Sequence, residues 1–136
     1  MEVAIVDDRG QVLIDTLVNP QQPIPWRAQS IHGISDDMVR GKPTLKTLMP
    51  EIIEIITNEE VVIYNANFDA PFFPGELRQA RAISCAMRRY AAHHGGPWRK
   101  LDEACRQVGH KWSGEAHRAL ADALACRSVW RWLNAR

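Results

Sequence analysis

The sequence predicts an α/β domain in which helices flank a mixed β-sheet. Two β-branched runs at residues 2–8 and 11–18 surround Arg9-Gly10 and predict a hairpin with a tight turn. A short apolar run at residues 61–64 predicts a buried strand, which helical segments precede and follow. A hairpin at the start of the chain, followed by helices and then a further strand, is typical of a mixed sheet covered by helices.

The helical segments follow one another without a linker or an internal repeat. A short helical turn is expected within residues 24–35 and ends at Gly33, after which Ser35 can cap the start of a second helix. Apolar residues recur at helical spacing over residues 44–57, which predicts an amphipathic helix. Further helices are expected at residues 68–82, 84–92, 99–108 and 118–133, with a loop at residues 93–97.

Composition restricts the class of protein. The 136 residues predict one domain, 1–136, and 46% apolar and 24% charged residues are ordinary for a globular protein. No apolar run is long enough for a membrane span, and the start shows no signal segment, so no membrane partner is expected. Three widely spaced cysteines form no CxxC pair, which argues against a disulfide framework and favours a reducing, cytoplasmic location.

Charge is distributed unevenly along the chain. Residues 1–60 hold ten acidic and five basic residues, whereas residues 61–136 hold twelve basic and six acidic residues. The middle of the second half carries most of the positive charge, at Arg78, Arg81, Arg88, Arg89, Arg99, Lys100, Arg106 and Lys111. Such a surface can attract a phosphate backbone, but solvated helix faces explain the same residues equally well.

The stretch EAHRALADA, residues 115–123, is the most informative motif. It places His117 just before a predicted helix and Asp122 in the opening turns of that helix. A histidine in this position can deprotonate a water molecule beside a metal ion that a carboxylate holds. The pattern alone is weak, because a histidine and an aspartate five residues apart are common by chance.

A second motif, NANFD at residues 65–69, directly follows the predicted strand VVIY. It places Asp69 beyond the carboxyl end of that strand, where open α/β sheets bind ligands. Asp69 is therefore either a residue of the binding cleft or a simple N-cap of the helix that follows. Position alone does not decide between the two interpretations.

Three motifs together resemble the DnaQ-like, or DEDDh, 3′–5′ exonucleases. IHGIS (31–35), NANFD (65–69) and HRALAD (117–122) occur in the order and approximate spacing of that family, supported by IDTLVNP (14–20) and WRKLDEAC (98–105). The resemblance covers essentially the whole chain. It implies a ribonuclease-H-like sheet, and hydrolysis of the terminal phosphodiester at a single-stranded DNA or RNA 3′ end by two Mg²⁺ or Mn²⁺ ions.

Carried over by position, the resemblance assigns roles to particular residues. His117 corresponds to the general base, Asp122 to a metal ligand, and Asp69 to a carboxylate that helps to hold the metal site through water. Contacts with the nucleic acid are expected from His32, Asn65, Asn67, Phe68 and Arg118. For His32 a structural role in a loop, and for Phe68 packing in the core, are the competing interpretations.

The family's first motif, an acidic DxE pair on the first strand, has no counterpart in residues 1–60. Residues 2–7 align with the family's second strand, so we expect the domain to be N-terminally truncated relative to the family and to lack the first central strand. Glu2 aligns within that second strand, and a solvated charge is expected for it as for Asp7, Asp8 and Asp15. Metal binding is consequently expected to be weak.

The missing strand leaves two structural alternatives and two functional ones, besides the explanation that the chain begins at an internal methionine of a longer protein. Either residues 61–64 pair directly with residues 2–7, or another segment or a second subunit fills the gap in the sheet. The chain is then either an exonuclease of doubtful activity, or a catalytically weakened nucleic-acid-binding or protein-interaction module on the same fold. Magnesium-dependent shortening of a 3′ end distinguishes the two.

Overall fold

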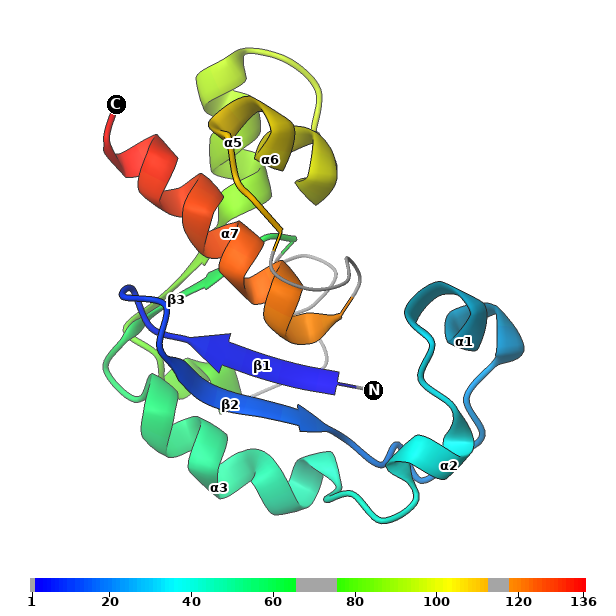
Figure 1. Ribbon diagram of the computed structural model, residues 1–136. Coiled ribbons are helices and arrows are strands. Elements are labelled where there is room, and N and C mark those ends of the chain that lie inside the picture. The colour runs from blue at the N-terminus through cyan, green and yellow to red at the C-terminus, as the bar shows by residue number, and fades with distance from the viewer. Residues whose placement is uncertain (1, 66–75, 113–117) are drawn as a thin grey trace.

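The hairpin predicted at the start of the chain is confirmed. The computed structural model describes residues 2–65, 76–112 and 118–136 (Figure 1). Strands β1 (Glu2–Val6) and β2 (Val12–Leu17) pair antiparallel, with a register shift between Ile5 and Val6. Gly10 has a φ of 84°, a left-handed conformation that glycine adopts without strain, so it suits the turn between the two strands.

Two short helices and one longer helix follow the hairpin where the sequence predicts them. Helix α1 (Trp26–His32) ends at Gly33 in a left-handed cap, and the Ser35 side chain caps α2 (Asp36–Val39) by accepting the Met38 N–H. Helix α3 (Leu45–Ile56) starts at Thr44, whose hydroxyl accepts the N–H of Thr47. These caps explain why local sequence located the three helices.

Strand β4 (Ala82–Cys85) is the main departure from the predicted elements. It pairs parallel with β3 (Glu60–Ile63), whereas helices were predicted to end near residue 82 and to start again at residue 84. Before β4 the chain forms only a 3₁₀ turn at Glu76–Gln79, and residues 66–75 lie outside the described ranges. A four-residue strand without alternating polarity carries no local signal, because pairing with distant β3 makes it a strand.

Three helices complete the fold. Helix α5 (Ala86–His94) begins later than predicted and includes His93 and His94, which were expected in the loop. Helix α6 (Leu101–Val108) and helix α7 (Ala119–Asn134) agree closely with the predicted helices at residues 99–108 and 118–133. None of the helices within the described ranges has the length and apolar character that a membrane crossing requires.

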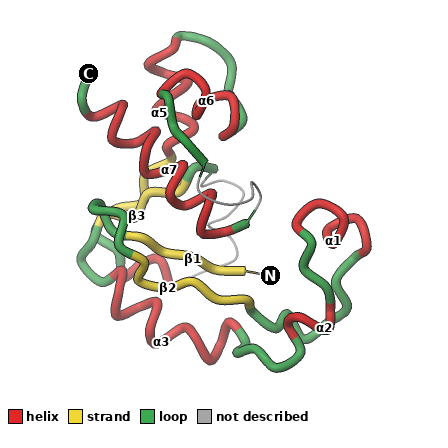
Figure 2. The backbone as a smooth tube through the Cα atoms, in the orientation of Figure 1, coloured by secondary structure: helices red, strands yellow, loops and turns green. Residues whose placement is uncertain are grey.

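Three apolar clusters hold the described elements together, and the smallest of them gathers Ile24, Ile34 and Val39 around α1 and α2. The first packs α3 against β1 and β2, with Val61 of β3 at its margin. The second joins α5, α6 and α7 around Tyr90, Ala125 and Val129. Helix α7 also contacts β1, so the strands lie between α3 on one side and α7 on the other (Figure 2).

The described strands form two separate two-stranded sheets, one antiparallel and one parallel. The expected mixture of strand directions is therefore present. Direct pairing of residues 61–64 with residues 2–7, one of the alternatives from the sequence, is wrong, because β1 and β3 belong to separate sheets. Among the described residues no strand pairs with the outer edge of β1.

Candidate functional site

Glu2 ties the N-terminus of α7 to the first strand. Its Oε1 accepts hydrogen bonds from the Ala119 backbone N–H (2.8 Å) and from Nε of Arg118 (3.1 Å), and its Oε2 accepts one from Nη2 of Arg118 (2.9 Å). The residue at the N-cap position is Arg118, whose side chain makes no capping hydrogen bond. A carboxylate at this end satisfies a helix N–H and interacts favourably with the helix dipole, so Glu2 supplies the missing cap.

The prediction of a solvated charge at Glu2 is therefore wrong. The side chain is only 9% exposed and forms an ion pair with Arg118. Burial raises the pKa of the Glu2 carboxyl, but the hydrogen bonds from Arg118 and Ala119 and the charge of Arg118 outweigh burial and leave the pKa below its ordinary value. No local pattern could reveal this contact, because its partners lie at the far end of the sequence. Asp8 and Asp15 are exposed, as expected.

Asp122 lies in the first turn of α7, half-buried, as the motif predicts. Its backbone N–H donates to the carbonyl of Arg118 at 3.0 Å, which closes the first turn of the helix. Burial raises the pKa of the Cys105 thiol to about 11, and the charges of Asp102 and Asp122 add to that increase. A carboxylate fixed on a helix suits a hard divalent cation.

The carboxyl end of β3 packs beside α7. Tyr64, directly after β3, packs against the cluster that contains Ala125 and Val129, and its hydroxyl donates to the Arg99 carbonyl at 2.6 Å. Burial raises the pKa of Tyr64 well above its ordinary value. Asn65 follows in the turn and is half-buried. The fold therefore brings the end of the strand before NANFD close to the helix of HRALAD.

Part of the predicted site lies outside the described residues. This applies to Asp69, Asn67, Phe68 and His117, so their predicted roles stay predictions. His32 is the last residue of α1, which lies to the side of the sheet and apart from α7 (Figure 1). Within the described ranges, no three His, Cys, Asp or Glu side chains gather in a way that could hold a metal ion.

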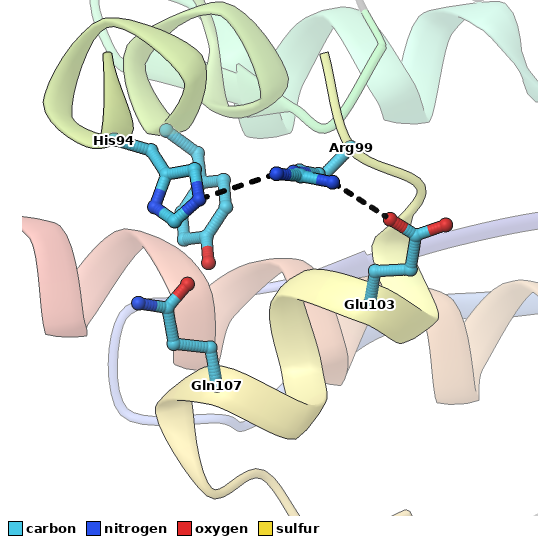
Figure 3. A pocket seen from close by; sticks show the side chains of 5 residues that line it. His94, Arg99, Glu103 and Gln107 are labelled. Atoms are coloured by element: carbon cyan, nitrogen blue, oxygen red, sulfur yellow. Dashed lines mark hydrogen bonds and ion pairs between the residues drawn. The ribbon is translucent and has the colours of Figure 1, made fainter. Parts of the chain in front are cut away.

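A small polar depression between α5 and α6 was not predicted. It has a volume of about 170 Å³ and is lined by Tyr90, His94, Arg99, Glu103 and Gln107 (Figure 3). The guanidinium of Arg99 lies between its neighbours, 3.4 Å from His94 Nε2 and 3.9 Å from the Glu103 carboxylate. Because Glu103 offsets the charge of Arg99, the depression has no strong preference for an anion or a cation.

Comparison with known families identifies the class of protein. The family model described as RNase_T, an exonuclease family, matches residues 2–129 of the chain. An uncharacterized exonuclease, CP81, of Escherichia phage 186 is 35% identical over an alignment of 143 positions, which covers 90% of this chain and 73% of that protein. The chain therefore belongs to the RNase_T exonuclease family, and specifically to its DnaQ-like 3′–5′ branch.

More distant matches agree with this placement. The DNA polymerase III subunit epsilon of Rickettsia conorii is 29% identical over 125 residues, and the chain spans 54% of that protein's length. The solved structure of exonuclease X in complex with 5′ overhanging duplex DNA has a TM-score of 0.77 at 24% identity, covering 97% of this chain and 80% of that one. The predicted ribonuclease-H-like α/β fold is thus confirmed.

Proposed function

We propose that residues 1–136 act as one domain that binds the 3′ end of a single-stranded DNA or RNA at the start of α7 and contributes to hydrolysis of its terminal phosphodiester. One observation carries this proposal. Asp122 is fixed in the first turn of α7, and the contacts of Glu2 with Arg118 and Ala119 hold that turn against β1. The relatives' names and the family match support a nuclease. We place the reaction in the cytoplasm.

Each residue type suits its proposed role. Asp122 and Asp69 would hold Mg²⁺ or Mn²⁺, which prefer carboxylate oxygen and water. A pair of such cations, when bound, stabilises the attacking and leaving oxygens of the displacement. His117 would take the proton of the attacking water, since histidine titrates near neutral pH. His32, Asn65, Asn67, Phe68 and Arg118 would contact the nucleic acid.

The activity of these 136 residues alone is proposed to be low. No DxE pair occurs in residues 1–60, so the carboxylates available to divalent cations are those of Asp122 and Asp69. Fewer carboxylates mean weaker cation binding. The outer edge of β1, which pairs with no described strand, supports the further proposal that another segment or a second subunit adds a strand there.

The test measures how fast a single-stranded oligonucleotide is shortened from its 3′ end in the presence of Mg²⁺ or Mn²⁺. The proteins compared are the chain, Asp122→Ala and a matched control, Asp102→Ala. Asp102 also lies in the first turn of a helix, α6, but its side chain is 58% exposed. We expect slow shortening or none from the chain. Rapid magnesium-dependent shortening that Asp122→Ala abolishes and Asp102→Ala preserves would show a fully active nuclease and overturn the proposal of low activity.

The second candidate function is a nucleic-acid-binding or interaction module that retains the nuclease fold. The missing DxE pair favours it for this chain. Replacement of His117 distinguishes the candidates, because a general base matters only where hydrolysis occurs. For the module we expect His117→Ala to leave oligonucleotide binding nearly unchanged, with no activity to lose. Loss of a measurable activity in His117→Ala would favour the nuclease.

A further inference from the structure

Three arginine side chains stack on tryptophan rings at the end of the molecule opposite to the start of α7. The guanidinium carbon of Arg88 lies 5.9 Å from the centre of the Trp98 ring, that of Arg89 4.6 Å from Trp130, and that of Arg136 4.1 Å from Trp132. These pairs belong to α5, the loop after it and the end of α7, which pack together (Figure 1). We call these six residues the arginine–tryptophan face.

The arginines of this face lack the carboxylate partner that some other arginines have. Arg40, Arg106 and Arg118 each form an ion pair with a carboxylate. In contrast, Arg88, Arg89 and Arg136 form no ion pair with any carboxylate of the described residues. The segments 77–101 and 123–136, which provide the face, contain no Asp or Glu at all. No side-chain carboxylate of these segments therefore neutralises the positive charge of this face, so it attracts polyanions.

Stacking also prepares these arginines for a particular ligand. A guanidinium that lies over an indole ring can keep N–H donors available, and these donors match the oxygens of a phosphate. Trp98 is 56% exposed, so it offers aromatic surface on which a base can stack. Charge combined with stacking surface is the usual chemistry for binding single-stranded nucleic acid.

We propose that the arginine–tryptophan face binds the phosphate backbone of a single-stranded nucleic acid, away from the site at Asp122. Trp130 lies eight residues after Asp122 in α7, a distance of about 12 Å along the helix axis. One strand can therefore contact Asp122 with its 3′ end and the face with nucleotides further along. This inference rests on the proposed function in one respect only, namely that the bound strand is the substrate of the site at Asp122.

The test measures binding of a fluorescent single-stranded DNA of about 20 nucleotides, with EDTA present so that no metal-dependent step contributes. The variant combines Arg88→Gln, Arg89→Gln and Arg136→Gln. The matched control removes three exposed positive charges elsewhere, with Arg9→Gln, Arg40→Gln and Lys46→Gln. We expect the face variant to bind at least about tenfold more weakly, and the slope of log affinity against log salt to fall by about 2, for three lost phosphate contacts. The control should change affinity less than about threefold.

A second variant keeps the test decisive if the first does not fold. Replacing the same three arginines with lysine retains the charge but loses the planar stacked group. We expect intermediate weakening, and a smaller quenching of tryptophan fluorescence by the oligonucleotide. Equal affinity of the chain, the lysine variant and the glutamine variant would overturn the proposal. So would equal competition by polyglutamate, which carries charge without bases.

Failure of this proposal differs from failure of the proposed function. Thymidine 5′-monophosphate p-nitrophenyl ester is too short to reach the arginine–tryptophan face from Asp122, so its hydrolysis reports only on the site at α7. Unchanged oligonucleotide binding in the face variant refutes nucleic-acid binding by the face and leaves the nuclease proposal intact. If the face variant loses oligonucleotide binding as expected and the chain does not hydrolyse the ester, the result supports nucleic-acid binding by the face and counts against catalysis at α7.

Discussion

The two ends of helix α7 are held in different ways. At its start, the Glu2 carboxylate binds Arg118 and the N–H of Ala119, a polar contact between the two ends of the sequence. Its second half is held by apolar packing, since Val129 is fully buried and Leu133 nearly so. The start carries the proposed catalytic carboxylate, whereas the second half belongs to the cluster around α5 and α6.

This difference shows how stability and function are separated along one helix. Buried apolar side chains of the second half account for most of the free energy of folding that α7 contributes. The polar contact at the start contributes less, but it sets where Asp122 stands relative to β1. Substitutions in the second half should therefore change stability most, and substitutions at the start should change the site at smaller cost to folding.

The largest effect is expected from Tyr90→Ala. Tyr90 of α5 is 2% exposed and packs against α7 in the second cluster, with its ring centre 6.1 Å from that of Trp132. Removing a buried aromatic ring should lower the free energy of unfolding by about 3–5 kcal/mol, measured by urea denaturation. Tyr90→Phe keeps the ring and should cost about 1 kcal/mol or less. A cost below about 1 kcal/mol for Tyr90→Ala would mean that this cluster does not anchor α7.

Glu2→Gln should have the next largest effect. It removes the charge from a nearly buried group that accepts three hydrogen bonds, so we expect a loss of about 1–3 kcal/mol in the free energy of unfolding. Glu51→Gln, on the exposed surface of α3, is the control and should change little. Combining Glu2→Gln with Arg118→Gln should give clear non-additivity, whereas additive losses would contradict a direct interaction.

The same contact predicts a pH dependence at acid pH. Because the pKa of folded Glu2 lies below its ordinary value of 4.5, the unfolded chain takes up the proton more readily. The stabilisation is therefore complete above about pH 4.5 and is lost as the pH falls below it. Glu2→Gln should remove this part of the pH dependence. An unchanged pH profile in the variant would contradict the interaction.

A smaller loss of stability is expected from His110, next to α6, and it begins at a higher pH than the loss from Glu2. Burial holds the pKa of His110 below its ordinary value of 6.5, and its Nδ1 lies 2.6 Å from the Ser128 hydroxyl. The folded state therefore favours neutral His110, and stability falls as the pH drops below about 6.5. The free energy of unfolding should be measured for the chain and for His110→Gln between about pH 7 and pH 5. It should decline less steeply with falling pH in the variant. Parallel declines would assign the pH dependence to other groups.

The smallest effect is expected from Arg106→Gln. Arg106 and Asp102 form an exposed ion pair on α6 at 3.6 Å, with 76% and 58% of the side chains exposed. Exposed pairs of this kind contribute about 0.2–0.5 kcal/mol. Urea denaturation should therefore hardly separate the variant from the parent chain. A loss above about 1 kcal/mol would show that this pair contributes more than exposed ion pairs usually do.

Local chemistry explains which features the sequence could predict. Gly33, Ser35 and Thr44 mark helix ends through their own backbone and side-chain preferences, and the motif at the start of α7 placed Asp122 in the correct turn. The contact of Glu2 with Arg118, strand β4 and the pair of Arg89 with Trp130 all depend on residues far apart in the sequence. No local pattern encodes these pairings, so they required the structure.

Paramagnetic broadening by Mn²⁺ tests the central claim most directly, because it detects even weak binding and locates it. We expect millimolar Mn²⁺ to broaden the backbone amide resonances most strongly in the first turn of α7, around Asp122, and much less toward the end of the helix, because the broadening falls steeply with distance from the ion. Asp122→Asn should remove the broadening, whereas Asp102→Asn should not. Broadening that is centred elsewhere, or that persists in Asp122→Asn, would contradict the assignment of the start of α7 as the metal-binding end of a nuclease site.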